Sequence, residues 1–176
     1  MITKQGIEAN PKQVHVIVKL ASPKTPKEVQ GLAGRLAALG RFIPRSSDKV
    51  APFFRTLKKA MNFSWNAKCD EEFDELKHLL ATPTVMTAPK AGETLYLYIA
   101  ISEISVSAAL ISRVAPKGEE KLVYYVSRTM VAHEKQYAPI EKAALAVVTT
   151  ATKLRPYFQA HFIIVLTNLP LKSTLS

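Results

Sequence analysis

The stretch LYLYIAIS, Leu95–Ser102, has the alternation of a β-strand and marks the start of a sheet. One face of this strand carries leucine and isoleucine at every second position, and the other face ends in Ala100 and Ser102. Two further β-type runs follow at 106–113 and 121–128, and the segment APKGEE between them favours a hairpin connection. The sheet is therefore expected to open with three consecutive strands.

A helix and a fourth strand complete this pattern. Residues 139–154 have helical periodicity, with apolar side chains on one face at Ile140, Ala144, Val147, Ala151 and Leu154. The run HFIIVLTN, residues 161–168, is continuous enough in apolar residues to predict a central strand. Three strands, a helix and another strand indicate the α/β class, of α+β type, with a mixed β-sheet and a packed helix.

The residues before the sheet carry helix signals instead. Asn10 precedes Pro11 as an N-cap, Thr25 and Glu28 form a capping box, and Asn66 can cap a third helix. The three apolar stripes are Val14, Ile17 and Val18; Val29, Leu32, Leu36 and Leu39; and Cys69, Phe73, Leu76 and Leu80.

A change of pattern separates these two parts. The stretch ATPTVMTAPKAGE, Ala81–Glu93, contains several turn-forming residues and has no periodicity. We therefore predict a helical region at 1–82, a linker at 83–93 and a β-rich domain at 94–176.

The composition favours an acidic partner. The chain of 176 residues has a net charge of +10, and the span Lys19–Lys59 carries ten cations against Glu28 and Asp48. A basic region of this kind is typical of proteins that bind nucleic acid. A single cysteine, Cys69, allows no internal disulfide, and no apolar run is long enough to span a membrane. The chain is expected to be intracellular, in a cytoplasmic particle or the nucleus, and not secreted.

No motif predicts a metal site. The segment HEKQY has Tyr137 where a zinc-binding helix would need its second histidine. Asp74 is the last aspartate of the chain, so the β-rich domain could offer only glutamates to a metal. Glu103, just after the first strand, and Glu141, in the first turn of the helix, lie nearest the expected edge of the sheet.

Several segments resemble one known family. The helical region (SPKTPKEVQGLAGRLAALGRFIPRSSDKVAPFFRTLKK, FSWNAKCDEEFDELKHLLATP) and the β-rich region (LYLYIAISEISVSAALISR, YAPIEKAALAVVTTATKLRPYFQAHFIIVLTNLPL) are similar to the pol polyprotein of plant long-terminal-repeat retrotransposons of the Ty3/gypsy class. The similarity covers nearly the whole chain in order. It implies reverse transcriptase thumb and connection helices followed by an RNase H-like domain, and a fragment that is truncated at its C-terminus.

The resemblance also implies where metal-binding carboxylates would stand. The three family positions fall on Ala100, Glu141 and Asn168, of which Glu141 alone is acidic. The two-metal hydrolysis of a phosphodiester needs several carboxylates around Mg²⁺ ions about 4 Å apart. We therefore expect no intact catalytic site, no metal and no cofactor, and a role as a tether ahead of a second, intact RNase H.

The same resemblance gives the basic residues a partner. The thumb of a reverse transcriptase lies along template and primer, so cations here would contact phosphates of an RNA/DNA hybrid or duplex without reading bases. The segment RFIPRSS is a candidate backbone-contacting turn. Further expected partners are the rest of the pol polyprotein: polymerase palm, downstream RNase H and integrase. The candidate nucleic-acid-binding residues are Lys24, Lys27, Arg35, Arg41, Arg45, Arg55, Lys58 and Lys59.

Two alternatives stay open from the sequence. The domain could be an active ribonuclease for RNA/DNA hybrids that binds Mg²⁺ through displaced ligands such as Glu103 and Glu141. It could also be a module that a host genome has taken over for protein binding.

Overall fold

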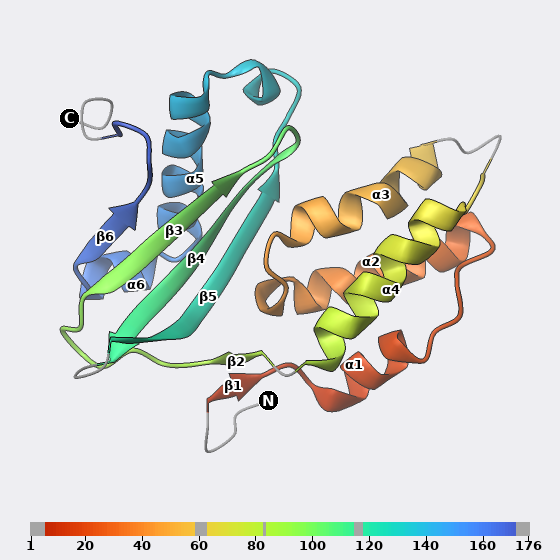
Figure 1. Cartoon of the computed structure of the whole chain (residues 1–176), viewed down its shortest axis with the longest axis horizontal. Coiled ribbons are helices and arrows are strands. Elements are labelled where there is room, and N and C mark those ends of the chain that lie inside the picture. Colours follow the sequence, from red (N-terminus) through yellow and green to blue (C-terminus); the bar gives the residue numbers. More distant parts are fainter. Residues whose placement is uncertain (1–5, 59–62, 83, 115–117, 172–176) are drawn as a thin grey trace.

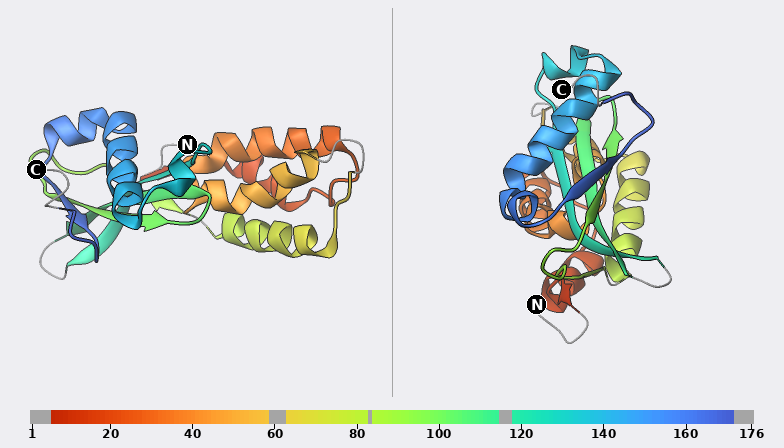
Figure 2. Two further views of the ribbon diagram at one scale, coloured as in Figure 1. Left: turned by 90° about the horizontal axis from the view of Figure 1, so that it is seen from above. Right: turned by 90° about the vertical axis from the view of Figure 1, so that its left-hand side faces the viewer.

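The computed structural model describes residues 6–58, 63–82, 84–114 and 118–171. The molecule is elongated, with helices at one end and a sheet at the other (Figure 1). We call residues 6–82 the helical half and residues 84–171 the sheet half. Figure 2 shows the same division from two further sides.

The larger sheet, which lies in the sheet half, has four strands among the described residues, in the order β5-β4-β3-β6. Neighbouring strands are antiparallel except β6, which runs parallel to β3. The predicted mixed α and β fold is thus confirmed. The predicted central position of the last strand is wrong for the described residues, because β6 pairs with β3 alone and lies at an edge. The strands are β3 (Leu95–Ile101), β4 (Ser105–Val114), β5 (Glu119–Thr129) and β6 (Ile163–Leu166).

Helix α5 (Pro139–Lys153) covers one face of this sheet, and α6 (Arg155–Ala160) follows it (Figure 2). Beneath α5, Leu95 and Leu97 are fully buried. The predicted apolar stripe of α5 is partly wrong, because the helix buries small residues that let it approach the strands closely. The buried ones are Ala143, Ala146 and Thr150, whereas Ile140, Ala144, Val147 and Ala151 are half-buried.

In its described residues, the helical half contains four helices and one 3-10 turn besides the short strand β1 (Ile7–Glu8). The predicted caps are confirmed: the side chain of Asn10 accepts from Lys12 N, Thr25 and Glu28 form a capping box, and Asn66 accepts from Cys69 N. The stripes of the two longest predicted helices are fully buried, Cys69 included. The elements are α1 (Pro11–Val18), α2 (Pro26–Leu39), η1 (Gly40–Phe42), α3 (Ser46–Lys58) and α4 (Ala67–Ala81).

Helix α3 is the longest element that was not predicted from the sequence. Pro52 lies in its interior, and proline there is a signal that breaks a helix, so it concealed one that tertiary packing stabilises. Arg45, just before the first residue of α3, has a φ of 52°, in the left-handed region. The predicted turn RFIPRSS is divided between η1, a link over 43–45 and the start of α3.

The two halves share the strand β5. The core of the helical half contains an aromatic cluster of Phe53, Trp65 and Phe73. The rings of Phe53 and Trp65 are stacked, with 5.3 Å between their centroids. Leu122 and Tyr124 of β5 pack against this same core. Within the predicted linker, strand β2 (Val85–Met86) pairs with β1 (Ile7–Glu8). No helix in the described part of the chain is long and apolar enough to cross a membrane.

Candidate functional site

The three positions implied for metal ligands lie at one end of the sheet. The β3–β6 ladder ends with Tyr98 opposite Leu166, and Ala100 and Asn168 each follow two residues later. Helix α5, which carries Glu141 in its first turn, begins at this same end (Figure 1). The topology therefore brings a methyl group, an amide and one carboxylate to the end of the sheet where the family would gather carboxylates.

Glu141 is engaged in capping α5. Its Oε2 atom accepts a hydrogen bond of 2.7 Å from the backbone N–H of Ala138, which satisfies a donor that the first helical turn leaves free. A carboxylate at a helix N-terminus is also stabilised by the helix dipole. The position of Glu141 thus has a structural explanation that needs no metal.

The donor set does not fit a pair of Mg²⁺ ions. Mg²⁺ requires octahedral oxygen ligands, and two of them need bridging carboxylates to offset their charge. Glu103 is exposed in the turn between β3 and β4. Among the described residues, no group of three or more His, Cys, Asp or Glu side chains could hold a metal ion.

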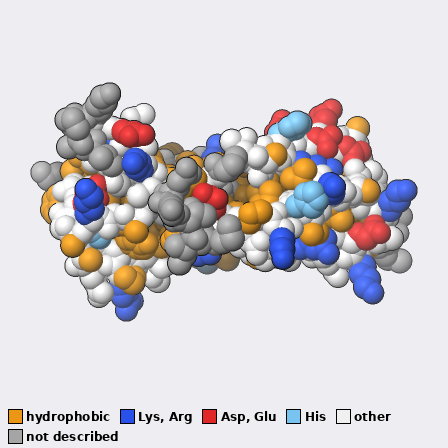
Figure 3. Space-filling model, turned by 90° about the horizontal axis from the view of Figure 1, so that it is seen from below, with side chains coloured by type: hydrophobic (Ala, Val, Ile, Leu, Met, Phe, Trp, Pro, Cys, Tyr) orange, Lys and Arg blue, Asp and Glu red, His pale blue; other side chains and the backbone are white. Residues whose placement is uncertain are grey.

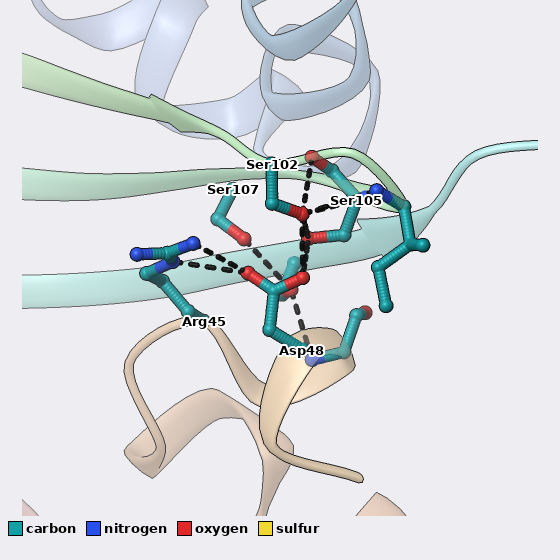
Figure 4. A network of polar contacts seen from close by, with 8 residues as sticks. Arg45, Asp48, Ser102, Ser105 and Ser107 are labelled. Carbon is teal, nitrogen blue, oxygen red and sulfur yellow. Dashed lines mark hydrogen bonds and ion pairs between the residues drawn. The ribbon is translucent and has the colours of Figure 1, made fainter. Parts of the chain in front are cut away.

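A polar network joins the first turn of α3 to serines of the sheet (Figure 4). It lies on the same face of the sheet as Ala100, because Ala100 pairs with Ser107 across the β3–β4 ladder. Asp48, from the first turn of α3, accepts hydrogen bonds from Ser102 Oγ at 2.6 Å and Ser105 Oγ at 2.8 Å. Its second carboxylate oxygen accepts from Arg45 Nε at 3.0 Å. The backbone N–H of Ser47 donates to Ser127 Oγ on β5. Serine hydroxyls of the β3–β4 turn, β4 and β5 therefore hold α3 against the sheet.

The same network reaches Ala100 through β4. Ala100 pairs across the ladder with Ser107, whose hydroxyl lies 2.9 Å from that of Ser127. Hydroxyl groups that are already bonded to one another and to α3 offer poor ligands for a cation. The side chains around Ala100 thus serve to hold α3 against the sheet.

The predicted cations are spread over the helical half. Lys24, Lys27 and Arg35 are exposed on and before α2, and Arg45 forms an ion pair with Asp48 at 2.9 Å. On the face in Figure 3, lysines and arginines alternate with acidic and apolar side chains over the helical end. Lys59 lies outside the described residues. Lysines and arginines therefore do not form one continuous patch on that face.

Three of them meet in a groove between the halves. Arg41, Arg55 and Lys58 line a hollow of about 900 Å³ between α2, α3 and β5. Two cations of the sheet half, Lys135 and Lys153, line it too. Among its described lining residues there is no aspartate or glutamate. The groove thus gathers positive charge from segments far apart in the sequence.

Two titratable groups of the sheet half border this region. Burial raises the pKa of the Tyr125 hydroxyl on the groove wall. Hydrogen bonds from the Arg128 guanidinium, and then from Val131 N, lower the pKa of Glu134 to about 2. Arg128 and Glu134 meet at 2.8 Å and hold η3 (Glu134–Gln136), which contains Lys135, against the end of β5.

A protein-family comparison now identifies this scaffold. Residues 65–165, more than half of the chain, match the RNase H-like domain found in reverse transcriptase. The chain belongs to this family.

The relatives of this RNase H-like domain are polyproteins of Ty3/gypsy-type transposons. It is 28% identical over 174 residues to the retrovirus-related Pol polyprotein from transposon 297 of Drosophila melanogaster, a match that covers 98% of the chain and 16% of the relative. It is 23% identical over 162 residues to the transposon Tf2-3 polyprotein of Schizosaccharomyces pombe, covering 90% of the chain and 12% of the relative. The chain therefore spans less than a fifth of the length of these relatives.

Solved structures share the fold of the RNase H-like domain and of the helices before it. The foamy viral protease-reverse transcriptase dRH in complex with double-stranded DNA matches with a TM-score of 0.74 and 19% identity, over 99% of this chain and 31% of that one. The foamy viral protease-reverse transcriptase in complex with RNA/DNA hybrid matches with a TM-score of 0.75 and 20% identity, over 93% of this chain and 22% of that one. At these identities the likeness establishes the fold.

The sequence analysis missed the contribution of the RNase H-like domain itself to the groove. Lys135 stands in a short 3-10 turn, and Lys153 ends α5. Both lie outside the basic span Lys19–Lys59, and tertiary packing alone brings them to the same groove as α3.

Proposed function

We propose that this chain is a catalytically inactive RNase H-like module of a Ty3/gypsy-class pol polyprotein that holds nucleic acid through its phosphates. The observation that carries the proposal is the chemistry at the end of the β3–β6 ladder, where Ala100 and Asn168 stand at positions that the family resemblance gives to acids. A methyl group cannot bind Mg²⁺, and a neutral amide does not bridge two ions as a carboxylate does.

Charge and similarity support the binding part of the proposal. Lysines and arginines that meet phosphates release counterions, so affinity is independent of base sequence and falls with salt. The candidate residues of the helical half, from Lys24 to Lys58, are exposed or line the groove. Two of the structural neighbours are complexes with double-stranded DNA and RNA/DNA hybrid.

The polyprotein context follows from the relatives. The module would act beside a polymerase palm, a downstream RNase H and an integrase inside the cell, and the sequence resemblance favours an element from a plant. In this arrangement residues 1–82 are the thumb and connection, 83–93 the linker and 94–176 the tether.

A nuclease assay tests the inactivity. Labelled RNA annealed to DNA is incubated with the protein in Mg²⁺ or Mn²⁺, beside the Glu141→Ala variant as a matched control. We expect equal, background cleavage from both proteins. Cleavage by the unaltered protein that Glu141→Ala abolishes would establish an active ribonuclease with displaced ligands.

A binding titration tests the rest. Affinity for hybrid or duplex is measured at several salt concentrations, and we expect the logarithm of the association constant to fall linearly with the logarithm of salt concentration. Binding no tighter at low salt than that of a neutral protein of similar size would refute this function.

A further inference from the structure

The groove between α2, α3 and β5 suggests which nucleic acid the module prefers. This inference rests on the proposed function, because it locates the phosphates that the cations would meet. The groove lies along an edge strand, with α2 and α3 as one wall and β5 as the other, and it spans both halves of the molecule.

Its cations stand on both walls. Arg55 and Lys58 belong to α3, while Lys135 and Lys153 belong to elements that flank β5. Arg41 lies over the ring of Phe42, 5.1 Å from the ring centroid, so its guanidinium is held at the groove by a buried side chain. Positive charge on opposite walls surrounds a phosphate chain instead of touching one side of it.

Aromatic side chains accompany these cations. Phe54 lines the groove and is 47% exposed, unlike its neighbour Phe53, which is fully buried. Tyr124 and Tyr125 line the β5 wall. A positive groove with exposed aromatic rings is the arrangement on which unpaired bases stack.

The size of the groove decides between single strand and duplex. A volume of about 900 Å³ is at the upper end of ordinary ligand pockets and accommodates a few nucleotides. A duplex, whose major groove alone is about 12 Å wide, is too broad to enter it. We infer that the groove binds a short single-stranded segment, with phosphates between the two walls and a base stacked on Phe54.

The test uses a fluorescein-labelled oligothymidylate and the same strand annealed to oligoadenylate. The double variant Arg55→Ala and Lys153→Ala removes one cation from each wall. It should reduce the slope of the logarithm of the association constant against the logarithm of salt concentration by about 1.4 for the single strand, at about 0.7 for each lost contact. Lys12→Ala and Lys68→Ala remove two exposed cations that lie outside the groove lining and outside the candidate binding residues, so this matched control should leave the slope unchanged.

A second variant tests the stacking. Phe54→Ala should weaken single-strand binding roughly 5- to 150-fold, which corresponds to the loss of one stacked base. Phe162→Ala removes another exposed aromatic side chain, 73% exposed and outside the groove lining, and should have no effect. Circular dichroism melting identifies any variant that has lost its fold.

The outcomes separate the two proposals. If the unaltered protein binds neither strand form, both the proposed function and this inference fail. If it binds but the groove variants behave like their controls, or if duplex binding falls as much as single-strand binding, the single-strand groove is refuted and the proposed function stands.

Discussion

The end of the β3–β6 ladder and the β5 edge of the same sheet carry different kinds of side chain. At the ladder end, two of the three positions implied for metal ligands are Ala100 and Asn168. The third, Glu141, is a carboxylate that caps α5. Along β5, five cations line the groove. Carboxylates that are clustered without a metal repel one another, so a site of this kind does not stabilise the metal-free fold. The comparison teaches that the positions implied for metal ligands and the proposed binding groove lie in separate parts of this fold.

The largest effect is expected where the β5 edge depends on the helical core. Phe53→Ala removes a fully buried ring from the aromatic cluster and should lower the free energy of unfolding by about 3–5 kcal/mol. Phe54→Ala, one residue later and 47% exposed, should change it by less than about 0.5 kcal/mol. Urea denaturation measures both, and equal losses would contradict the assigned core.

A smaller effect is expected at the joint between the two regions. Asp48→Ala leaves Ser102 and Ser105 without their acceptor and should lower the free energy of unfolding by about 1–3 kcal/mol. Asp74→Ala removes an exposed ion pair with Lys77 and should cost at most about 0.5 kcal/mol. A loss no greater for Asp48 than for Asp74 would mean that α3 is held by apolar contacts alone.

Acids introduced at the two positions implied for metal ligands sharpen the comparison directly. In the double variant Ala100→Asp and Asn168→Asp, Mn²⁺ at ten times its dissociation constant should raise the free energy of unfolding by about 1.4 kcal/mol. The unaltered protein should not respond. Thermal melting with and without Mn²⁺ measures the difference, and an equal response of both proteins would show that the substituted positions are not the metal site.

The smallest effect concerns acid sensitivity beside the groove. The pKa of Glu134 is about 2 in the folded protein against an ordinary value of 4.5, because Arg128 and Val131 N donate to its carboxylate. Its stabilisation is complete above pH 4.5 and is lost as the pH falls through about 2. Glu134→Gln should therefore flatten the dependence of stability on pH across this range, as measured by urea midpoints. An unchanged slope would contradict the ion pair.

Local chemistry explains what could be predicted from the sequence. Caps and apolar stripes depend on residues three or four positions apart, so Thr25, Glu28 and the stripe from Cys69 to Leu80 were predicted correctly. The face of α5 was misjudged because alanines and Thr150 carry weak hydrophobic signals, although close packing buries them. Nothing local relates Lys135 or Lys153 to α3, so the groove could not be predicted.

Strand β5 has one further consequence, for aggregation. An edge strand presents unpaired backbone groups to other chains. Here the 3-10 turn η1 and helix α3 pack along β5, and Thr87 N donates to Leu122 O at 2.7 Å. The helical half and the segment around Thr87 thus cover part of this edge. Removing the helices would expose more of β5 to pairing with other chains, so resistance to aggregation depends on the same packing that forms the groove.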